Sequence, residues 1–184
     1  MMAPARLLAA VLLLGLGACQ AAAPPASSPI DVGRPRLTVE AEGLRWFLPP
    51  GGSARPLPFG TEQGAVLASL ERARGPASRG VNRDCGAGPV ETATWADGLS
   101  LVFQGGKFAG WGLDGRAAGA IGTANGIQPG TTRAELEANV ANARIFRSTL
   151  GTEFAAGGFF GLLDGTRPTA RITDLWAGVN CVAR

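Results

Sequence analysis

Only carboxylates, hydroxyls and thiols could carry out chemistry in this chain, because its 184 residues include no histidine. The absence of imidazole removes the commonest general base and every catalytic triad that depends on histidine. Two acids in one cleft would still permit glycoside hydrolysis. Asp97, Asp114 and Asp164 each precede a glycine, where an aspartate caps a turn, while Glu153 and Asp174 lie beside expected strands. We therefore expect no enzyme, no metal and no cofactor, and a hydrolase built on two acids is the weakest alternative.

The N-terminal residues have the layout of a secretory signal. Arg6 supplies one positive charge, an apolar run extends from Leu7 to Leu16, and small residues follow. The run is too short to remain as a bilayer-spanning helix, which needs about 20 apolar residues. We therefore expect residues 1–18 to be a signal peptide.

The end of this signal resembles the lipobox of bacterial lipoproteins, with Leu-Gly-Ala at residues 16–18 followed by Cys19. The resemblance implies that Cys19 is diacylated and becomes the new N-terminus; the alternative is a plain secretory signal. Residues 19–36 then form a disordered tether, because Gln20 to Pro29 contains only Gln, Ala, Pro and Ser. In Gram-negative lipoproteins, an aspartate after the lipidated cysteine retains the protein at the inner membrane. Gln20 therefore implies an outer membrane location facing the periplasm, if the source has one.

Cys85 and Cys181 are the cysteines that remain in the mature domain. Two cysteines in an oxidising compartment most often pair, so we expect a Cys85–Cys181 disulfide rather than two free thiols. A bridge that closes a loop of roughly a hundred residues stabilises a fold by up to about 4 to 5 kcal/mol in the chain-entropy model.

Charge argues against a nucleic-acid partner, and composition indicates the type of fold. The formal net charge of +3 is small and the arginines are scattered, which argues against nucleic acid. The 28 glycines and the low charged fraction indicate a turn-rich fold containing β-strands.

A local pattern occurs twice, seventy positions apart, at residues 59–67 and 129–137. In each copy a Gly-Thr pair precedes a helical stretch, and the threonine is expected to be the helix N-cap. The expected helices cover residues 62–74 and 132–142. Expected strands cover residues 39–47 before the first helix, then 90–95, 99–104 and 108–113, and after the second helix 145–150, 158–163 and 171–175.

The predicted fold class is therefore α+β, with two tandem repeats of a helix followed by an antiparallel meander, forming one continuous domain. Residues 37–114 would be the first repeat, residues 115–126 the linker and residues 127–184 the second repeat.

This arrangement looks like the two-repeat fold of the beta-lactamase inhibitory proteins, because Gly-Thr opens each helix and cysteines follow the first helix and lie near the C-terminus. It is also similar to the small outer-membrane lipoproteins of the barrel-assembly machinery, which have one such unit. Residues 85–89, 95–99 and 108–111 look like segments of uncharacterised bacterial envelope lipoproteins.

Tryptophan is the residue type that most favours a binding surface. Most aromatic rings in alternating strands should be buried, but Trp46 and Trp111 lie near expected turns, and tryptophan is common at interface anchors. We interpret these two residues as a candidate binding surface.

The leading hypothesis is a lipid-anchored envelope protein that binds or scaffolds a protein partner without catalysis. The alternative is a glycan- or peptidoglycan-binding lipoprotein, and the oligomeric state stays open.

Lipidation at Cys19 can be tested directly. We expect radiolabelled palmitate to enter the wild-type protein, because acyl chains on this cysteine are the membrane anchor. The Cys19→Ala variant should lose the label and stop fractionating with lipid. An unlabelled wild-type protein, with a Cys19→Ala variant that still fractionates with lipid, would contradict the assignment.

Overall fold

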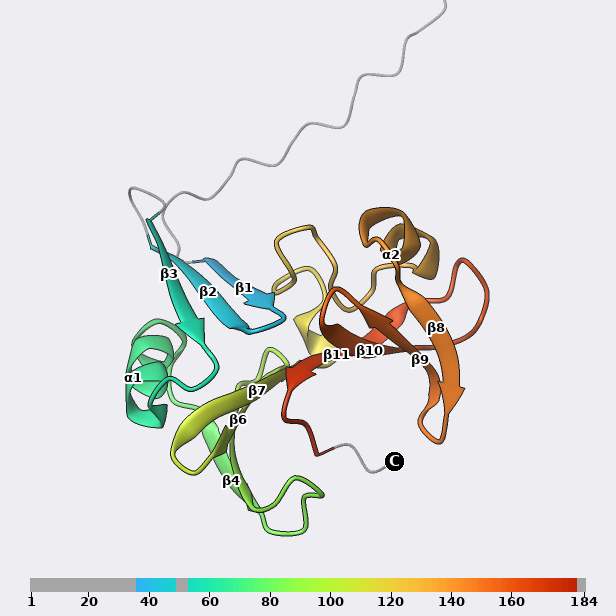
Figure 1. Ribbon diagram of the computed structural model, residues 1–184. Coiled ribbons are helices and arrows are strands. Elements are labelled where there is room, and N and C mark those ends of the chain that lie inside the picture. The colour runs from blue at the N-terminus through green and yellow to red at the C-terminus, as the bar shows by residue number, and fades with distance from the viewer. Residues whose placement is uncertain (1–35, 49–52, 182–184) are drawn as a thin grey trace, which may run out of the picture. The chain divides into compact units, whose positions relative to one another are not determined.

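Antiparallel strands dominate the computed structural model, which describes residues 36–48 and 53–181 (Figure 1). Within these residues there are two α-helices and eleven strands arranged in two sheets, so the α+β class is confirmed. The predicted signal peptide, the lipidated Cys19 and the tether up to residue 35 lie outside the described residues.

The smaller sheet has the order β1-β2-β3 and consists of β1 (Arg36–Glu40), β2 (Gly43–Leu48) and β3 (Ser53–Pro58). The prediction of one strand over residues 39–47 is wrong, because a turn at residues 41 and 42 divides it into a hairpin. Gly43 makes this turn possible: it has φ +148°, and a Cβ atom there would lie 2.3 Å from the carbonyl oxygen of Leu57. Strand β3 was not predicted because it contains two prolines, which only an edge strand tolerates.

The larger sheet contains two four-stranded meanders in the order β4-β5-β6-β7-β11-β10-β9-β8. Helix α1 (Gln63–Arg74) precedes the first meander, and the short helix η1 (Gly115–Ala117) and α2 (Arg133–Asn139) precede the second. The strands are β4 (Ser78–Asn82), β5 (Val90–Thr94), β6 (Leu99–Gln104), β7 (Lys107–Leu113), β8 (Arg144–Ser148), β9 (Gly151–Ala156), β10 (Phe159–Leu163) and β11 (Ile172–Gly178). The sequence did not predict β4, whose residues are all exposed, or β9.

The two meanders meet where β7 pairs with β11, side by side in the middle of Figure 1. Gly112 is the cross-strand partner of Trp176, and Trp111 is the partner of Ala177. Because β7 and β11 are the last strands of their meanders, this pairing removes the edge that each meander would otherwise expose.

Each helix is attached to the last strand of the meander that follows it. The N–H of Gly60 donates to the carbonyl oxygen of Phe108 at 2.7 Å, and the N–H of Gly130 donates to that of Ile172 at 2.8 Å. In return, the N–H of Phe108 donates to the carbonyl oxygen of Thr61 at 2.8 Å, and the N–H of Ile172 donates to that of Thr131 at 2.9 Å. Both glycines have positive φ, +89° and +93°, so the Gly-Thr pairs form turns that fix where each helix begins.

The helix caps differ from the expected threonines of the Gly-Thr pairs. In α1 the N-cap is Glu62, which makes no side-chain cap hydrogen bond, while the hydroxyl of Thr61 donates to the carbonyl oxygen of Pro58 at 2.7 Å. In α2 the N-cap is Thr132, one position later than predicted. It forms a reciprocal capping box with Glu135, which lowers the pKa of that exposed carboxyl, mainly through the backbone hydrogen bond from Thr132.

The main core lies between one face of the larger sheet, the smaller sheet and the two helices. It includes Trp46 of β2, Leu70 of α1, Trp111 of β7 and Leu136 of α2. Residues 115–126, expected as a linker, also pack against the smaller sheet, since the N–H of Val39 donates to the carbonyl oxygen of Gly122 at 3.0 Å. All described residues belong to one compact unit.

The predicted disulfide between Cys85 and Cys181 is present, with 5.1 Å between the Cα atoms. It ties the end of the described chain to the loop between β4 and β5. Residues 179–181, named here the C-terminal strap, cross the other face of the larger sheet over Gly110. A Cβ atom on Gly110 would lie 2.0 Å from the carbonyl oxygen of Val179, so only glycine leaves room for the strap.

Removing the disulfide should destabilise the fold. The bridged cysteines are 96 positions apart, so we expect Cys85→Ser with Cys181→Ser to lower the free energy of unfolding by up to about 4 to 5 kcal/mol. Urea unfolding followed by tryptophan fluorescence measures the change, with the reduced wild-type protein as the matched comparison. An unchanged unfolding midpoint would show that the strap is held without the bridge.

Candidate functional site

The two tryptophans predicted to form a binding surface are buried. Trp46 is 5% exposed and Trp111 is 0% exposed, and the indole N–H of Trp111 donates to the carbonyl oxygen of Glu40 at 2.7 Å. The prediction is wrong because both side chains lie on strand faces that meet the main core. Trp95 and Trp176 are 4% and 5% exposed, so no tryptophan of the chain offers an exposed ring.

Three of the five acids considered for catalysis, Asp97, Glu153 and Asp164, have structural positions outside the cleft described below. Asp97 pairs with Arg74 of α1, and Asp164 accepts a hydrogen bond from the N–H of Arg171 at 2.8 Å. Glu153 is fully buried in β9. The prediction of a turn-capping role is confirmed for Asp114, which accepts a hydrogen bond from the N–H of Arg116 two residues later at 2.9 Å. The remaining acid, Asp174, lines a cleft of the larger sheet that Asp114 also lines.

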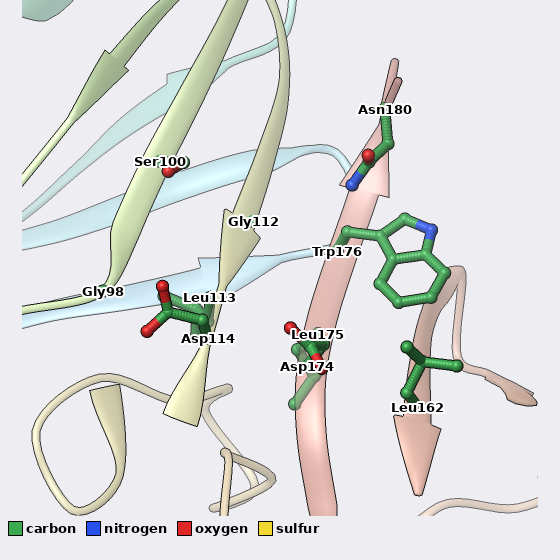
Figure 2. Close-up of a pocket in the computed structure, with 10 residues that line it drawn as sticks. All are labelled: Gly98, Ser100, Gly112, Leu113, Asp114, Leu162, Asp174, Leu175, Trp176 and Asn180. Atoms are coloured by element: carbon green, nitrogen blue, oxygen red, sulfur yellow. The ribbon is translucent and has the colours of Figure 1, made fainter. Parts of the chain in front are cut away.

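This cleft, of about 290 Å³, opens on the larger sheet where β6, β7, β11 and β10 lie next to one another (Figure 2). Its side chains come from the face of the sheet that is turned away from the main core. Ser100 of β6, Asp174 and Trp176 of β11, and Leu162 of β10 all line it. We call this the sheet-face cleft.

Gly112 of β7 accounts for the hollow in the sheet face. It pairs with Ser100 on one side and with Trp176 on the other, and it places no side chain between them. Asn180 of the C-terminal strap closes one end of the cleft. A Cβ atom on Gly112 would meet its nearest neighbours at 3.8 and 4.0 Å, so the space above this residue is open.

The charge of the cleft is acidic. Asp114 and Asp174 both line it, and no lysine or arginine does. The side chain of Arg116 donates to Asp114, with 2.5 Å between Nη2 and Oδ2, and this contact holds the pKa of Asp114 below its ordinary value despite some burial. Within the described part of the chain, the carboxylate of Asp174 has no ion pair or hydrogen bond, so its charge is not neutralised there.

Apolar side chains continue the same sheet face beyond the cleft. Phe146 of β8 is 39% exposed and Phe160 of β10 is 36% exposed. Phe160 is the cross-strand partner of Trp176, and Leu162 is the partner of Asp174. The cleft and the exposed apolar side chains of the second meander thus share one surface, which we call the apolar sheet face; it also carries the buried Glu153, the cross-strand partner of both Leu162 and Phe146.

One feature of the sequence marks this site, namely a glycine within a strand. A glycine inside a strand often marks a close approach of another group, and Gly112 is the last but one residue of β7. The local sequence indicates only a possible acid at Asp174 and a strand residue at Leu162, and neither pattern indicates a cleft.

Metal-ligating groups and membrane-spanning helices were sought in residues 36–48 and 53–181. No three His, Cys, Asp or Glu residues there lie close enough to hold a metal ion, and neither helix is long and apolar enough to cross a membrane. Comparisons with protein-family models, curated proteins and solved structures find no match to this chain.

The ionised state of Asp114 can be tested through Arg116. Because the folded-state pKa of Asp114 is lowered, its stabilising effect is present above the unfolded pKa and is lost as the pH falls through the folded pKa. We expect Arg116→Gln to raise the pKa of Asp114 toward its ordinary value, measured by carboxyl carbon NMR titration. Arg167→Gln, on an exposed loop, is the control, and an Asp114 pKa unchanged by Arg116→Gln would contradict the assignment.

Proposed function

We propose that this protein is a lipid-anchored, non-enzymatic module that binds a protein partner in the bacterial envelope through its apolar sheet face. The observation that carries the proposal is the open cleft next to partly exposed aromatic rings, on a sheet whose other face forms the main core. Exposed apolar side chains around a cleft are typical of protein-binding surfaces.

The proposed location rests on the N-terminal sequence and on the disulfide. A lipidated Cys19 would tether the domain to a membrane, outside the cytoplasm, and on the periplasmic side of an outer membrane if the source has one. The Cys85–Cys181 bridge supports an oxidising compartment, since such bonds are rare in reducing ones.

The contacts favour a protein partner over the two other functions considered. The glycan-binding hypothesis depended on exposed tryptophans, and all four indoles are buried. The hydrolase hypothesis needed two acids across a cleft, about 5 to 10 Å apart. Of the acids in the sheet-face cleft, Asp114 is engaged by Arg116 and its pKa is lowered, which makes it a poor proton donor.

We also propose that the domain consists of two copies of one α+β unit, as the resemblance to the beta-lactamase inhibitory proteins implies. Two features support this. The Gly-Thr turns before α1 and α2 make equivalent backbone hydrogen bonds to β7 and β11. In addition, the strand before each of these last strands has a register irregularity, at residues 102 and 103 in β6 and at 162 and 163 in β10. In this description Gly112 and Trp176 are equivalent positions that face each other.

Photocrosslinking from the sheet face tests the proposed function. A benzoylphenylalanine at Leu162, in the full-length protein in its native membrane, should form a discrete crosslink to one envelope protein, because this side chain lines the cleft. The matched control is the same residue at Ala68, which is exposed on α1, away from this sheet face. Equal crosslinking patterns from the two positions, or none from Leu162, would contradict binding through the apolar sheet face.

A further inference from the structure

The size of the sheet-face cleft suits a single side chain. Its volume of about 290 Å³ is just below the range for small-molecule pockets, about 300 to 1,000 Å³. Gly112 forms its floor, and Leu162 and Trp176 provide an apolar wall (Figure 2). A long unbranched side chain from a partner could therefore enter over Gly112 and pack against this wall.

The charges of the cleft determine what such a side chain must carry at its end. Asp174 contributes a carboxylate that is not neutralised by any described residue, and Asp114 contributes a second one that is shared with Arg116. The hydroxyl of Ser100, which lies 3.0 Å from the hydroxyl of Thr94, adds a neutral acceptor. Anionic ligands are disfavoured, because no cationic side chain lines the cleft although the chain has 17 lysines and arginines.

An apolar wall combined with unneutralised carboxylates matches an amphipathic cation. The lysine and arginine side chains have an apolar stem and a charged head, so the stem would pack on Leu162 and Trp176 while the head meets Asp174. A bare metal ion is a poorer match, since the described residues contain no group of three or more metal-ligating side chains.

We propose, on the basis of the protein-binding function above, that the sheet-face cleft receives a lysine or arginine side chain from the partner. The partner is thus recognised through a protruding cationic residue whose stem is buried between β7 and β10. The sheet face beside the cleft then contacts the residues that flank this side chain.

Titration with capped amino acids tests this inference independently of the partner. N-acetyl-lysine and N-acetyl-arginine methylamides should produce saturable shifts in the NMR signals of the Gly112 amide and the Trp176 indole of the full-length lipidated protein in detergent. N-acetyl-norleucine methylamide, which keeps the stem without the charge, should bind about tenfold more weakly or less. Equal binding of the norleucine compound, or no shifts with the cationic compounds, would overturn the proposal.

Two variants assign the binding to the cleft. Asp174→Asn removes the charge at nearly constant size, and Gly112→Val fills the floor at a position where a Cβ atom has room. Each should weaken the binding of the lysine compound about tenfold or more, whereas Asp84→Asn, the same change on an exposed loop, should leave it unchanged. Wild-type affinity in both cleft variants would place the binding elsewhere and overturn the proposal.

The same variants separate this inference from the proposed function. If the Leu162 crosslink persists in Gly112→Val and Asp174→Asn, the protein binds its partner without a cationic side chain in the cleft, and only the inference fails. If the cationic compounds bind as expected but Leu162 forms no crosslink in membranes, the cleft has the inferred chemistry and the proposed function fails.

Discussion

Hydrogen bonding between β7 and β11 joins the two four-stranded meanders into one eight-stranded sheet, and the other features of the domain depend on it. The Gly-Thr turns that precede α1 and α2 are hydrogen-bonded to the same two strands. The positions of both helices therefore depend on this pairing. It also places Gly112 beside Trp176, two residues that are far apart in the sequence. The sheet-face cleft exists only because these strands are neighbours.

Glycines on β7 serve two purposes on the face turned away from the main core. Gly110 leaves space for the backbone of Val179, so the C-terminal strap can reach Cys85 across the sheet. Gly112 leaves space that the strap does not fill, and this space becomes the floor of the cleft. The residues on the opposite face, Trp111 among them, remain large and buried. One strand therefore supplies a packed core on one side and an accessible hollow on the other.

The α+β class, the two helices and most strands of the larger sheet followed from local patterns in the sequence, and the disulfide followed from the pair of cysteines in an expected oxidising compartment. The hairpin at residues 41 and 42 was missed because the apolar pattern continues through the turn. Trp46 and Trp111 were assigned to the wrong environment, since being near a turn does not determine which strand face meets the core. The cleft could not be predicted, because it depends on the pairing of β7 with β11 and on the path of the strap, which are long-range features.

The pairing of β7 with β11 is tested most directly by nuclear Overhauser contacts between backbone protons of the two strands. In the oxidised protein we expect contacts between Gly112 and Trp176 and between Trp111 and Ala177. Contacts that pair β7 with another strand, or two meanders with no contacts between them, would contradict the continuous sheet and remove the basis for the cleft.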